Sequence, residues 1–174
     1  MGSNFIHYLL KSTKGVKALI LDKLTYAGNP KNLKGLPTDR FTLIKGDICD
    51  TELVKRLMSR SDFVINFAAE THVDRSIHND VGVFLETNVN GVYSLLEALK
   101  YSTRILKMIH VSTDEVWGDL GFNSLRKFTE RSPFRPRSPY AASKAAGDLL
   151  INSYVHTYRL PIITSHSVNN FGPR

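Results

Sequence analysis

Residues 63–67 read FVINF, residues 83–99 read VFLETNVNGVYSLLEAL, and residues 107–111 read KMIHV. The two short segments are apolar and almost without polar alternation, which is typical of strands buried on both faces of a parallel sheet. The segment between them is long and amphipathic, as expected for a helix. A strand, a helix and a second strand in this order predict a βαβ unit and therefore an α/β fold.

The rest of the chain continues this alternation. Further strands are predicted at 16–21, 41–44 and 162–164, and further helices at 5–11, 50–60 and 140–158, with long loops at 22–39 and 113–139. Asp50 and Ser138-Pro139 stand where helix starts are expected. The pattern predicts one Rossmann-like domain over residues 1–174, with a doubly wound parallel sheet.

The composition limits the classes of protein that fit. The 174 residues are 42% hydrophobic and 22% charged, which is near the globular average and excludes a disordered tail. No apolar run approaches the roughly 20 residues that span a bilayer, and no signal peptide is apparent. The lone Cys49 cannot form an intrachain disulfide. We expect a soluble cytoplasmic protein with no membrane partner.

The net charge of +7 raises the possibility of a nucleic-acid partner. The basic residues are scattered, however, apart from Arg126-Lys127 and the segment 131–137, and no basic stripe is interleaved with aromatic residues. We therefore expect no nucleic acid to bind. The histidines show no metal-ligand spacing, so no metal site is expected either.

The two ends of the sequence are unusual for this fold. A dinucleotide-binding fold opens with a strand and a Gly-rich turn before its first helix, whereas this chain begins within that helix. It stops at Asn170-Phe171-Gly172-Pro173-Arg174, directly after a strand. We interpret the sequence as a fragment cut at both ends. Without the central first strand, the sheet is expected to open between the strands at 16–21 and 63–67.

Acidic residues follow the first two predicted strands. Asp22 could accept hydrogen bonds from both ribose hydroxyls of an adenosine, and its charge would repel a 2′-phosphate, which favours NAD over NADP. A carboxylate that caps the following turn explains an isolated Asp equally well. Asp47-Ile48 is a second candidate contact to adenine and is also ambiguous when taken alone.

Tyr140 and Lys144 are four residues apart on a predicted helix and so share a face. The Lys144 ammonium could then lower the pKa of the Tyr140 phenol from about 10 toward neutrality. Such pairs are common by chance. Ser112-Thr113, at the end of the strand at 107–111, strengthens the interpretation because it could place a hydroxyl opposite Tyr140.

Asp114 and Glu115 are adjacent carboxylic residues at the exit of the same buried strand. In one cleft, charge repulsion and burial separate the pKa values of two carboxyl groups and give one acid and one base, as an elimination requires. An isolated Asp-Glu pair is more often a solvated turn.

Together these motifs resemble those of the dTDP-glucose 4,6-dehydratases, a family of extended short-chain dehydrogenases. The matching segments follow the family's order: Asp22–Asn29, Gly46–Asp50, Ala68–Ser76, Glu86–Val89, Ser112–Val116, Ser138–Ala145 and Asn169–Pro173. Of the family's three turn glycines only the last has a match, Gly2. Residues 165–168 differ from the usual pattern, and Trp117 stands where the family usually has Tyr.

The resemblance implies which residues line the site. The NAD site would consist of Gly2, Asp22, Lys23, Leu24, Thr25, Asp47, Ile48, Phe67, Ala68, Ala69, Glu70, Thr71, Thr87, Tyr140, Lys144 and Asn170. The sugar nucleotide would contact Thr71, Thr113 and Asn169, and the catalytic residues would be Thr113, Asp114, Glu115, Tyr140 and Lys144.

The resemblance also implies a reaction, that of a lyase with tightly bound NAD in deoxysugar and rhamnose biosynthesis, acting as a homodimer. Tyr140 would remove the C4 hydroxyl proton of dTDP-glucose while hydride passes to NAD. Glu115 would then abstract the C5 proton as Asp114 protonates the departing C6 hydroxyl, and hydride would return to C6 to give dTDP-4-keto-6-deoxy-glucose.

Three alternatives remain open at this point. A related epimerase or decarboxylase would share Asp22, Tyr140 and Lys144 but would not need Asp114 and Glu115. A non-catalytic remnant would keep the motifs without activity. A nucleic-acid-binding module would use the net charge. We further expect residues 1–174 alone to be poorly folded and inactive, because buried backbone groups at the opened sheet would lack partners.

Overall fold

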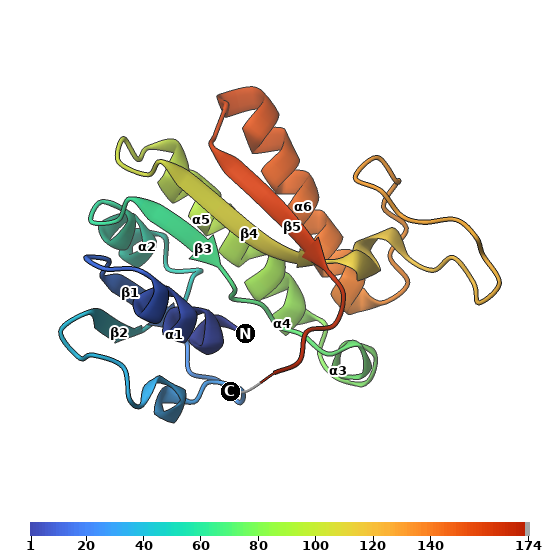
Figure 1. Ribbon diagram of the computed structural model, residues 1–174. Helices are drawn as coiled ribbons and strands as arrows, with labels where there is room; N and C mark the ends of the chain where they lie inside the picture. The colour runs from blue at the N-terminus through green and yellow to red at the C-terminus, as the bar shows by residue number, and fades with distance from the viewer. Residues whose placement is uncertain (173–174) are drawn as a thin grey trace.

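The computed structural model describes residues 1–172, so Pro173 of the last motif and Arg174 lie outside the described residues. The elements in chain order are α1 Gly2–Ser12, β1 Ala18–Asp22, the 3-10 helix η1 Pro30–Leu33, β2 Phe41–Lys45, α2 Thr51–Met58, β3 Phe63–Asn66, α3 Val73–His78, α4 Gly82–Leu85, the π-helix η2 Glu86–Asn90, α5 Gly91–Lys100, β4 Lys107–Thr113, the 3-10 helix η3 Asp114–Trp117, α6 Pro139–Tyr158 and β5 Ile162–Ser167 (Figure 1). All five predicted strands are present. The strand predicted at 107–111 continues through Thr113, so Ser112 and Thr113 lie in the strand itself.

The strands form two parallel sheets. β1 pairs with β2, and β3, β4 and β5 pair in that order. The predicted opening between the strands at 16–21 and 63–67 is confirmed, because β1 and β3 do not pair in the part of the chain that the structure describes. Side chains meet across the opening instead: the rings of Phe5 on α1 and Phe67 after β3 lie 5.4 Å apart.

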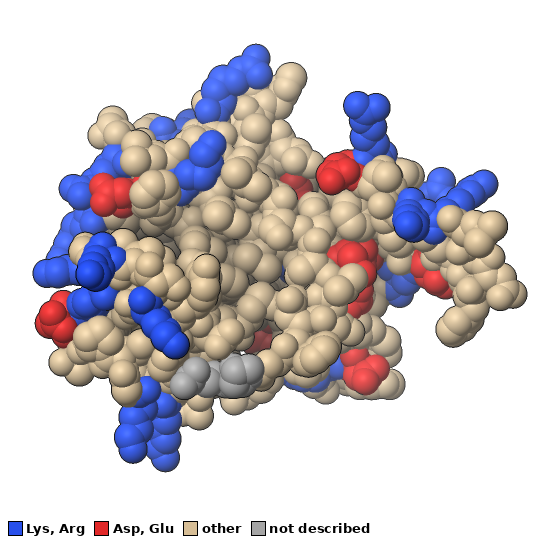
Figure 2. All heavy atoms as spheres, in the orientation of Figure 1, with Lys and Arg blue, Asp and Glu red and all other residues tan. Residues whose placement is uncertain are grey.

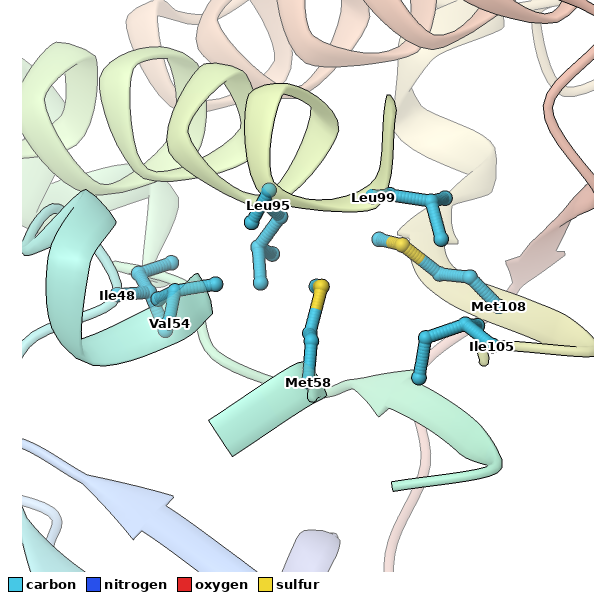
Figure 3. Close-up of a cluster of buried hydrophobic side chains, with 8 residues drawn as sticks. Ile48, Val54, Met58, Leu95, Leu99, Ile105 and Met108 are labelled. Atoms are coloured by element: carbon cyan, nitrogen blue, oxygen red, sulfur yellow. The ribbon is translucent and has the colours of Figure 1, made fainter. Parts of the chain in front are cut away.

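Helices α2, α5 and α6 lie on one side of the strands, and α1 lies on the other (Figure 1). The main hydrophobic cluster fills the space between α2, α5 and the strands (Figure 3); its buried members are Ile48, Val54, Met58, Leu95, Ala98, Leu99, Ile105 and Met108. Alternate residues of β4, including Met108 and His110, are buried on this side. The helix-covered face of β4 therefore carries both core and polar side chains.

The opposite face of the larger sheet is less covered. Phe63 is 65% exposed and Ile163 is 52% exposed. In Figure 2, which views the molecule from this side, the centre of the face is uncharged and Lys and Arg lie around its rim. The basic residues thus form no single stripe on the face shown. Within residues 1–172, no helix has the length and hydropathy needed to cross a membrane.

Side-chain caps fix the starts of two helices where the sequence predicted them. The Asp50 carboxylate accepts a hydrogen bond from the Leu53 N–H at 2.9 Å, and α2 begins at the next residue. The Ser138 hydroxyl accepts from the Ala141 N–H at 3.1 Å, with Pro139 in the first turn of α6. This second cap sets the position of Tyr140.

The helix predicted at 83–99 is not continuous. It is divided into α4, the π-helix η2 and α5. The π-helix lies where the chain packs closely against α6: a Cβ on Gly147 would lie only 2.6 Å from the carbonyl oxygen of Asn88. A π-turn shifts the backbone by one residue and so changes which side chains face inward, and such turns are frequent at functional sites. Here Asn88 is buried between the two helices.

We expect Gly147→Ala to lower the free energy of unfolding by about 1–3 kcal/mol, because the new methyl group has no room beside Asn88. Helix propensity alone would change stability by about 1 kcal/mol in the opposite direction. Chemical denaturation measures the effect. Ala142→Gly, at an exposed position of the same helix, is the control for propensity, and a stabilised Gly147→Ala protein would contradict the close approach.

Candidate active site

The predicted site residues lie where the strands end. Asp22 ends β1, Asp47 follows β2, Phe67 follows β3, Thr113 ends β4, and Asn169 follows β5. Because the strands within each sheet are parallel, their carboxyl ends meet at one edge. This is the edge at which open α/β sheets bind ligands.

At the end of β1, the exposed Asp22 carboxylate accepts a hydrogen bond from the Leu24 N–H at 2.7 Å. This is the turn-capping contact that was the alternative to binding an adenosine ribose. It uses only one of the two carboxylate oxygens of Asp22. Leu24 has a φ of 56°, a left-handed conformation that is uncommon for Leu. The turn thus holds the Asp22 carboxylate at the surface beside the strand end.

Lys23 and Asp47 form an ion pair between the two strand ends. The Lys23 Nζ lies 2.6 Å from Asp47 Oδ2, while the Cys49 N–H donates to Asp47 Oδ1 at 3.0 Å. Burial alone would raise the pKa of Asp47, but the hydrogen bonds from Cys49 and Lys23 outweigh it and lower that pKa. The Lys23 ammonium is therefore already neutralised by a carboxylate.

A hollow of about 280 Å³ opens next to this ion pair, and it is lined by Lys23, Thr25, Glu70, Asp80, Gly82, Val83, Glu86 and Thr87. Four of these residues were predicted to contact NAD. Their hydroxyl, ammonium and carboxylate groups are the donors and acceptors that ribose and phosphate groups require. The donor set therefore fits the adenosine half of a dinucleotide.

Asn88 holds the backbone of Glu70, which is one of the residues that line this hollow. Its Oδ1 accepts from the Glu70 N–H at 3.0 Å, and its Nδ2 donates to the Glu70 carbonyl at 2.9 Å and to Ser143 Oγ at 2.9 Å. Sequence reasoning did not single out Asn88 as a site residue. Its place inside the Glu86–Val89 motif was the available signal.

The other residues predicted to contact NAD lie in different surroundings. Gly2 lies against the Phe67 side chain, and Ala68, Ala69 and Thr71 follow β3 toward the site edge. The Ile48 side chain belongs to the buried hydrophobic cluster. Only the Ile48 backbone is left for an adenine contact.

The paired asparagines follow β5. Asn170 is exposed, and its side-chain amide donates to Ser167 Oγ at 3.0 Å and to the Val168 carbonyl at 2.8 Å. Asn169 is also exposed. Both therefore lie at the sheet edge, where the sequence placed them.

Thr113, Asp114 and Glu115 form the turn that leaves β4. The Thr113 Oγ1 accepts from the Glu115 N–H at 3.3 Å and lies 3.4 Å from Asp114 Oδ1. Burial and the neighbouring Asp114 charge raise the pKa of Glu115. The Glu115 carboxyl group is therefore a stronger base than an ordinary carboxyl group.

Tyr140 lies close to this turn but differs from prediction in one respect. Burial and the Glu115 charge raise the pKa of its phenol, and a hydrogen bond with Thr113 opposes them only in part. The predicted lowering by Lys144 is therefore wrong for this structure. Burial is the largest cause of the rise, and the Lys144 Nζ donates to the Val111 carbonyl at 2.9 Å.

A second, smaller hollow lies beside the acidic turn, with a volume of about 170 Å³; its lining residues are Val73, Glu115, Gly118, Asp119, Arg137, Ser138 and Ala141. Glu115 thus faces an open space next to the start of α6. A group held there would be within reach of both the acidic turn and Tyr140.

Beneath Tyr140 and Lys144 lies a set of connected polar side chains. Ser112 was predicted to lie near Tyr140, whereas sequence reasoning did not assign the others to the site: the buried Asn66, His110 and Asp148 and the partly buried His166. Asn66 and His110 interrupt apolar strand segments, which was the available signal. His110 had been interpreted as a core or surface histidine, and it is buried. No cluster of His, Cys, Asp or Glu suited to a metal ion occurs in the described part of the chain.

Comparison with known proteins places this arrangement in a family. The model of the family described as GDP-mannose 4,6 dehydratase matches residues 1–174. The chain belongs to this dehydratase family. The resemblance to dTDP-glucose 4,6-dehydratases inferred from the motifs is thereby confirmed.

Relatives in the dehydratase family are similar over the whole of this chain. The dTDP-glucose 4,6-dehydratase of Mycolicibacterium smegmatis is 43% identical over 173 residues, which cover 99% of this chain and 51% of that protein. The low-salt glycan biosynthesis protein Agl12 of Haloferax volcanii is 46% identical over 177 residues, covering 100% of this chain and 54% of that protein. The chain thus spans about half the length of the curated relatives it matches.

A solved member has the same fold. The structure of DesIV, a dTDP-glucose 4,6-dehydratase from Streptomyces venezuelae with NAD and TYD bound, matches with a TM-score of 0.90 and 42% identity, covering 99% of this chain and 53% of that one. The α/β fold with parallel sheets therefore corresponds to part of a dehydratase.

The buried Lys144 predicts a pH dependence of stability. Burial lowers the pKa of Lys144 from 10.5 to about 8, although Asp148 opposes the shift. Between these values the unfolded chain binds a proton that the folded protein does not, so this residue makes the free energy of unfolding rise with pH, by up to about 1.4 kcal/mol per pH unit. The rise should be absent below about pH 8.

Denaturation curves of wild type and Lys144→Met across this range measure the difference. We expect the gap between the two proteins to grow above about pH 8. Lys17→Met, at an exposed position, should keep the wild-type pH dependence. Parallel curves for wild type and Lys144→Met would contradict the prediction.

Proposed function

We propose that the complete protein is an NAD-dependent dTDP-glucose 4,6-dehydratase. The observation that carries this proposal is the convergence of Asp114, Glu115 and Tyr140 at one strand exit, where the Glu115 charge acts on the Tyr140 phenol. A reaction that only moves hydride needs Tyr140 but not two adjacent carboxyl groups. An elimination needs one acid and one base beside the redox centre.

The chain offers groups suited to each part of NAD. Asp22 and the hollow lined by Lys23, Thr25 and Thr87 suit the adenosine half, and Tyr140 and Lys144 suit the nicotinamide half. NAD, when bound, supplies the acceptor for a hydride from C4 and its donor to C6. Solved dTDP-glucose 4,6-dehydratases with NAD bound support this assignment.

The protein's own groups handle the protons. Tyr140 takes the proton of the C4 hydroxyl during oxidation, which requires that the phenol lose its proton despite its raised pKa. The hydrogen bond with Thr113 favours that loss, because it opposes the rise of the phenol pKa. Glu115, whose raised pKa makes it a stronger base than an ordinary carboxylate, then removes the C5 proton. Asp114 donates a proton to the departing C6 hydroxyl.

The rest of the proposal follows the family resemblance. Thr71, Thr113 and Asn169 contact the sugar nucleotide, and the complete protein works as a cytoplasmic homodimer in deoxysugar biosynthesis. Size-exclusion chromatography with light scattering tests the dimer. A related epimerase is the second candidate, because its hydride chemistry uses the same Tyr140 and Lys144; it leaves Asp114 and Glu115 without a role.

Cofactor choice tests the adenosine half of the site. We expect NAD to bind the complete protein more tightly than NADP, because Asp22 repels a 2′-phosphate and Asp47 neutralises Lys23. Asp47→Asn should reduce the preference by about tenfold, since it leaves the Lys23 ammonium unpaired beside the 2′ position. The double variant Asp47→Asn/Lys23→Met should regain the preference. Calorimetric titration of both cofactors measures it, and equal affinities in the wild type would remove the assignment.

Product analysis tests the elimination. Glu115→Gln and Asp114→Asn should each slow loss of water from C6 by about 10²–10⁴-fold while leaving C4 oxidation measurable, because the two carboxyl groups act after the first hydride transfer. Tyr140→Phe should impair oxidation itself. Glu130→Gln, which alters an exposed carboxylate on the loop after η3, is the matched control. Undiminished formation of the 4-keto-6-deoxy product in both acidic variants would favour the epimerase.

A further inference from the structure

Asp148 joins three elements beneath the candidate active site. It lies on α6 and is 1% exposed. Ser112 Oγ on β4 donates to Asp148 Oδ2 at 2.7 Å, and His166 Nε2 on β5 lies 3.0 Å from the same oxygen. The helix that carries Tyr140 and Lys144 is thus bound through one carboxylate to both neighbouring strands.

The other carboxylate oxygen faces His110. Within residues 1–172, Asp148 Oδ1 has no hydrogen-bond partner, and His110 Nε2 lies 3.7 Å from it. The tautomer of His110 follows from Asn66, whose Oδ1 accepts from the Ala68 N–H and whose Nδ2 therefore donates to His110 Nδ1 at 3.1 Å. The single proton of a neutral His110 is then on Nε2, on the side of Asp148.

Lys144 approaches the same His110 nitrogen as this carboxylate. It is 3% exposed, one helical turn before Asp148, and its Nζ lies 2.9 Å from the Val111 carbonyl and 3.4 Å from His110 Nε2. A neutral imidazole with its proton on Nε2 cannot accept a hydrogen bond from the ammonium there. A buried ammonium needs a compensating charge, and Asp148 is a buried carboxylate one helical turn away that approaches the same His110 nitrogen.

We propose that Asp148 is a positioning residue for Lys144: it keeps the buried ammonium charged and, through Ser112 and His166, fixes α6 against β4 and β5. The inference rests on the proposed role of Lys144 in the NAD site. Asp148 itself touches neither cofactor nor substrate in this arrangement, because it is enclosed below the catalytic groups. It acts only through Lys144 and the strand contacts.

The surroundings of Asp148 include both places where the sequence departs from the family pattern. The rings of Trp117 and His166 lie 4.7 Å apart, and Phe134 lies 6.1 Å from His166. These aromatic contacts hold the imidazole that binds the carboxylate. The two departures, which seemed unrelated in the sequence, therefore form one contact that supports Asp148.

The test compares the charge of Lys144 with and without Asp148. In the complete protein, the difference in unfolding free energy between wild type and Lys144→Met marks the pH at which folded Lys144 loses its proton. The same difference between Asp148→Asn and Asp148→Asn/Lys144→Met marks it without the carboxylate. The titratable groups that face Lys144 are Asp148 and Tyr140 on α6, His110 on β4 and, through Asp148, His166 on β5. The two proteins within each pair differ only at Lys144, so the other titratable groups are the same in both.

We expect the onset of the pH-dependent rise to move down by at least about one pH unit in the Asp148→Asn pair. Asp62→Asn removes an exposed carboxylate that pairs with Arg104 on the surface, and it should leave the onset in place. The Kd for NAD at pH 7.5, measured by calorimetry, should rise by about tenfold in Asp148→Asn, which is the loss expected for one hydrogen bond to a charged group.

An unchanged onset in the Asp148→Asn pair would overturn the proposal. If Asp148→Asn does not fold, the double variant decides: a folded Asp148→Asn/Lys144→Met protein supports a compensating pair of charges, and an unfolded one shows that Asp148 serves the strand contacts alone. If the wild type does not bind NAD, the proposed function fails, but the comparison of onsets still decides the role of Asp148.

Discussion

A lysine side chain enclosed in the protein interior requires an anion and hydrogen-bond acceptors close by. Lys144 meets this requirement with the Val111 carbonyl and with Asp148, and each partner belongs to an element that forms the site. The position of α6 over β4 follows from these contacts as much as from apolar packing. Tyr140 lies one turn earlier on the same helix, so its place beside Thr113 depends on the same anchoring.

Much of this arrangement could be predicted from the sequence. The strands, the capped helix starts at Asp50 and Ser138, and the opening between the two sheets depend on local patterns and on strand order, which short motifs reveal. The π-helix at Glu86–Asn90 could not be predicted in this way. It lies at the contact between Asn88 and Gly147, which are far apart in the sequence and meet only when the helices pack.

The candidate site also has features that the sequence predicts and features that it does not. Motifs placed Asp22, Asp114 and Glu115 at the strand ends, because position along a parallel strand determines the edge it reaches, and they placed Tyr140 at the start of a helix. The raised pKa of Tyr140 and the burial of the Ile48 side chain depend on the surroundings of each side chain in three dimensions. So does the polar network around Asp148, whose members come from three strands and one helix.

The contact between Phe5 and Phe67 across the open sheet has a consequence for how a long ligand would bind. Such ring contacts are non-directional, whereas the hydrogen bonds within each sheet fix the register of neighbouring strands. Asp22 belongs to one sheet, and Thr113 belongs to the other. A dinucleotide that reaches both would behave as a bivalent ligand, with the spacing of the two sheets setting the effective concentration of its second half.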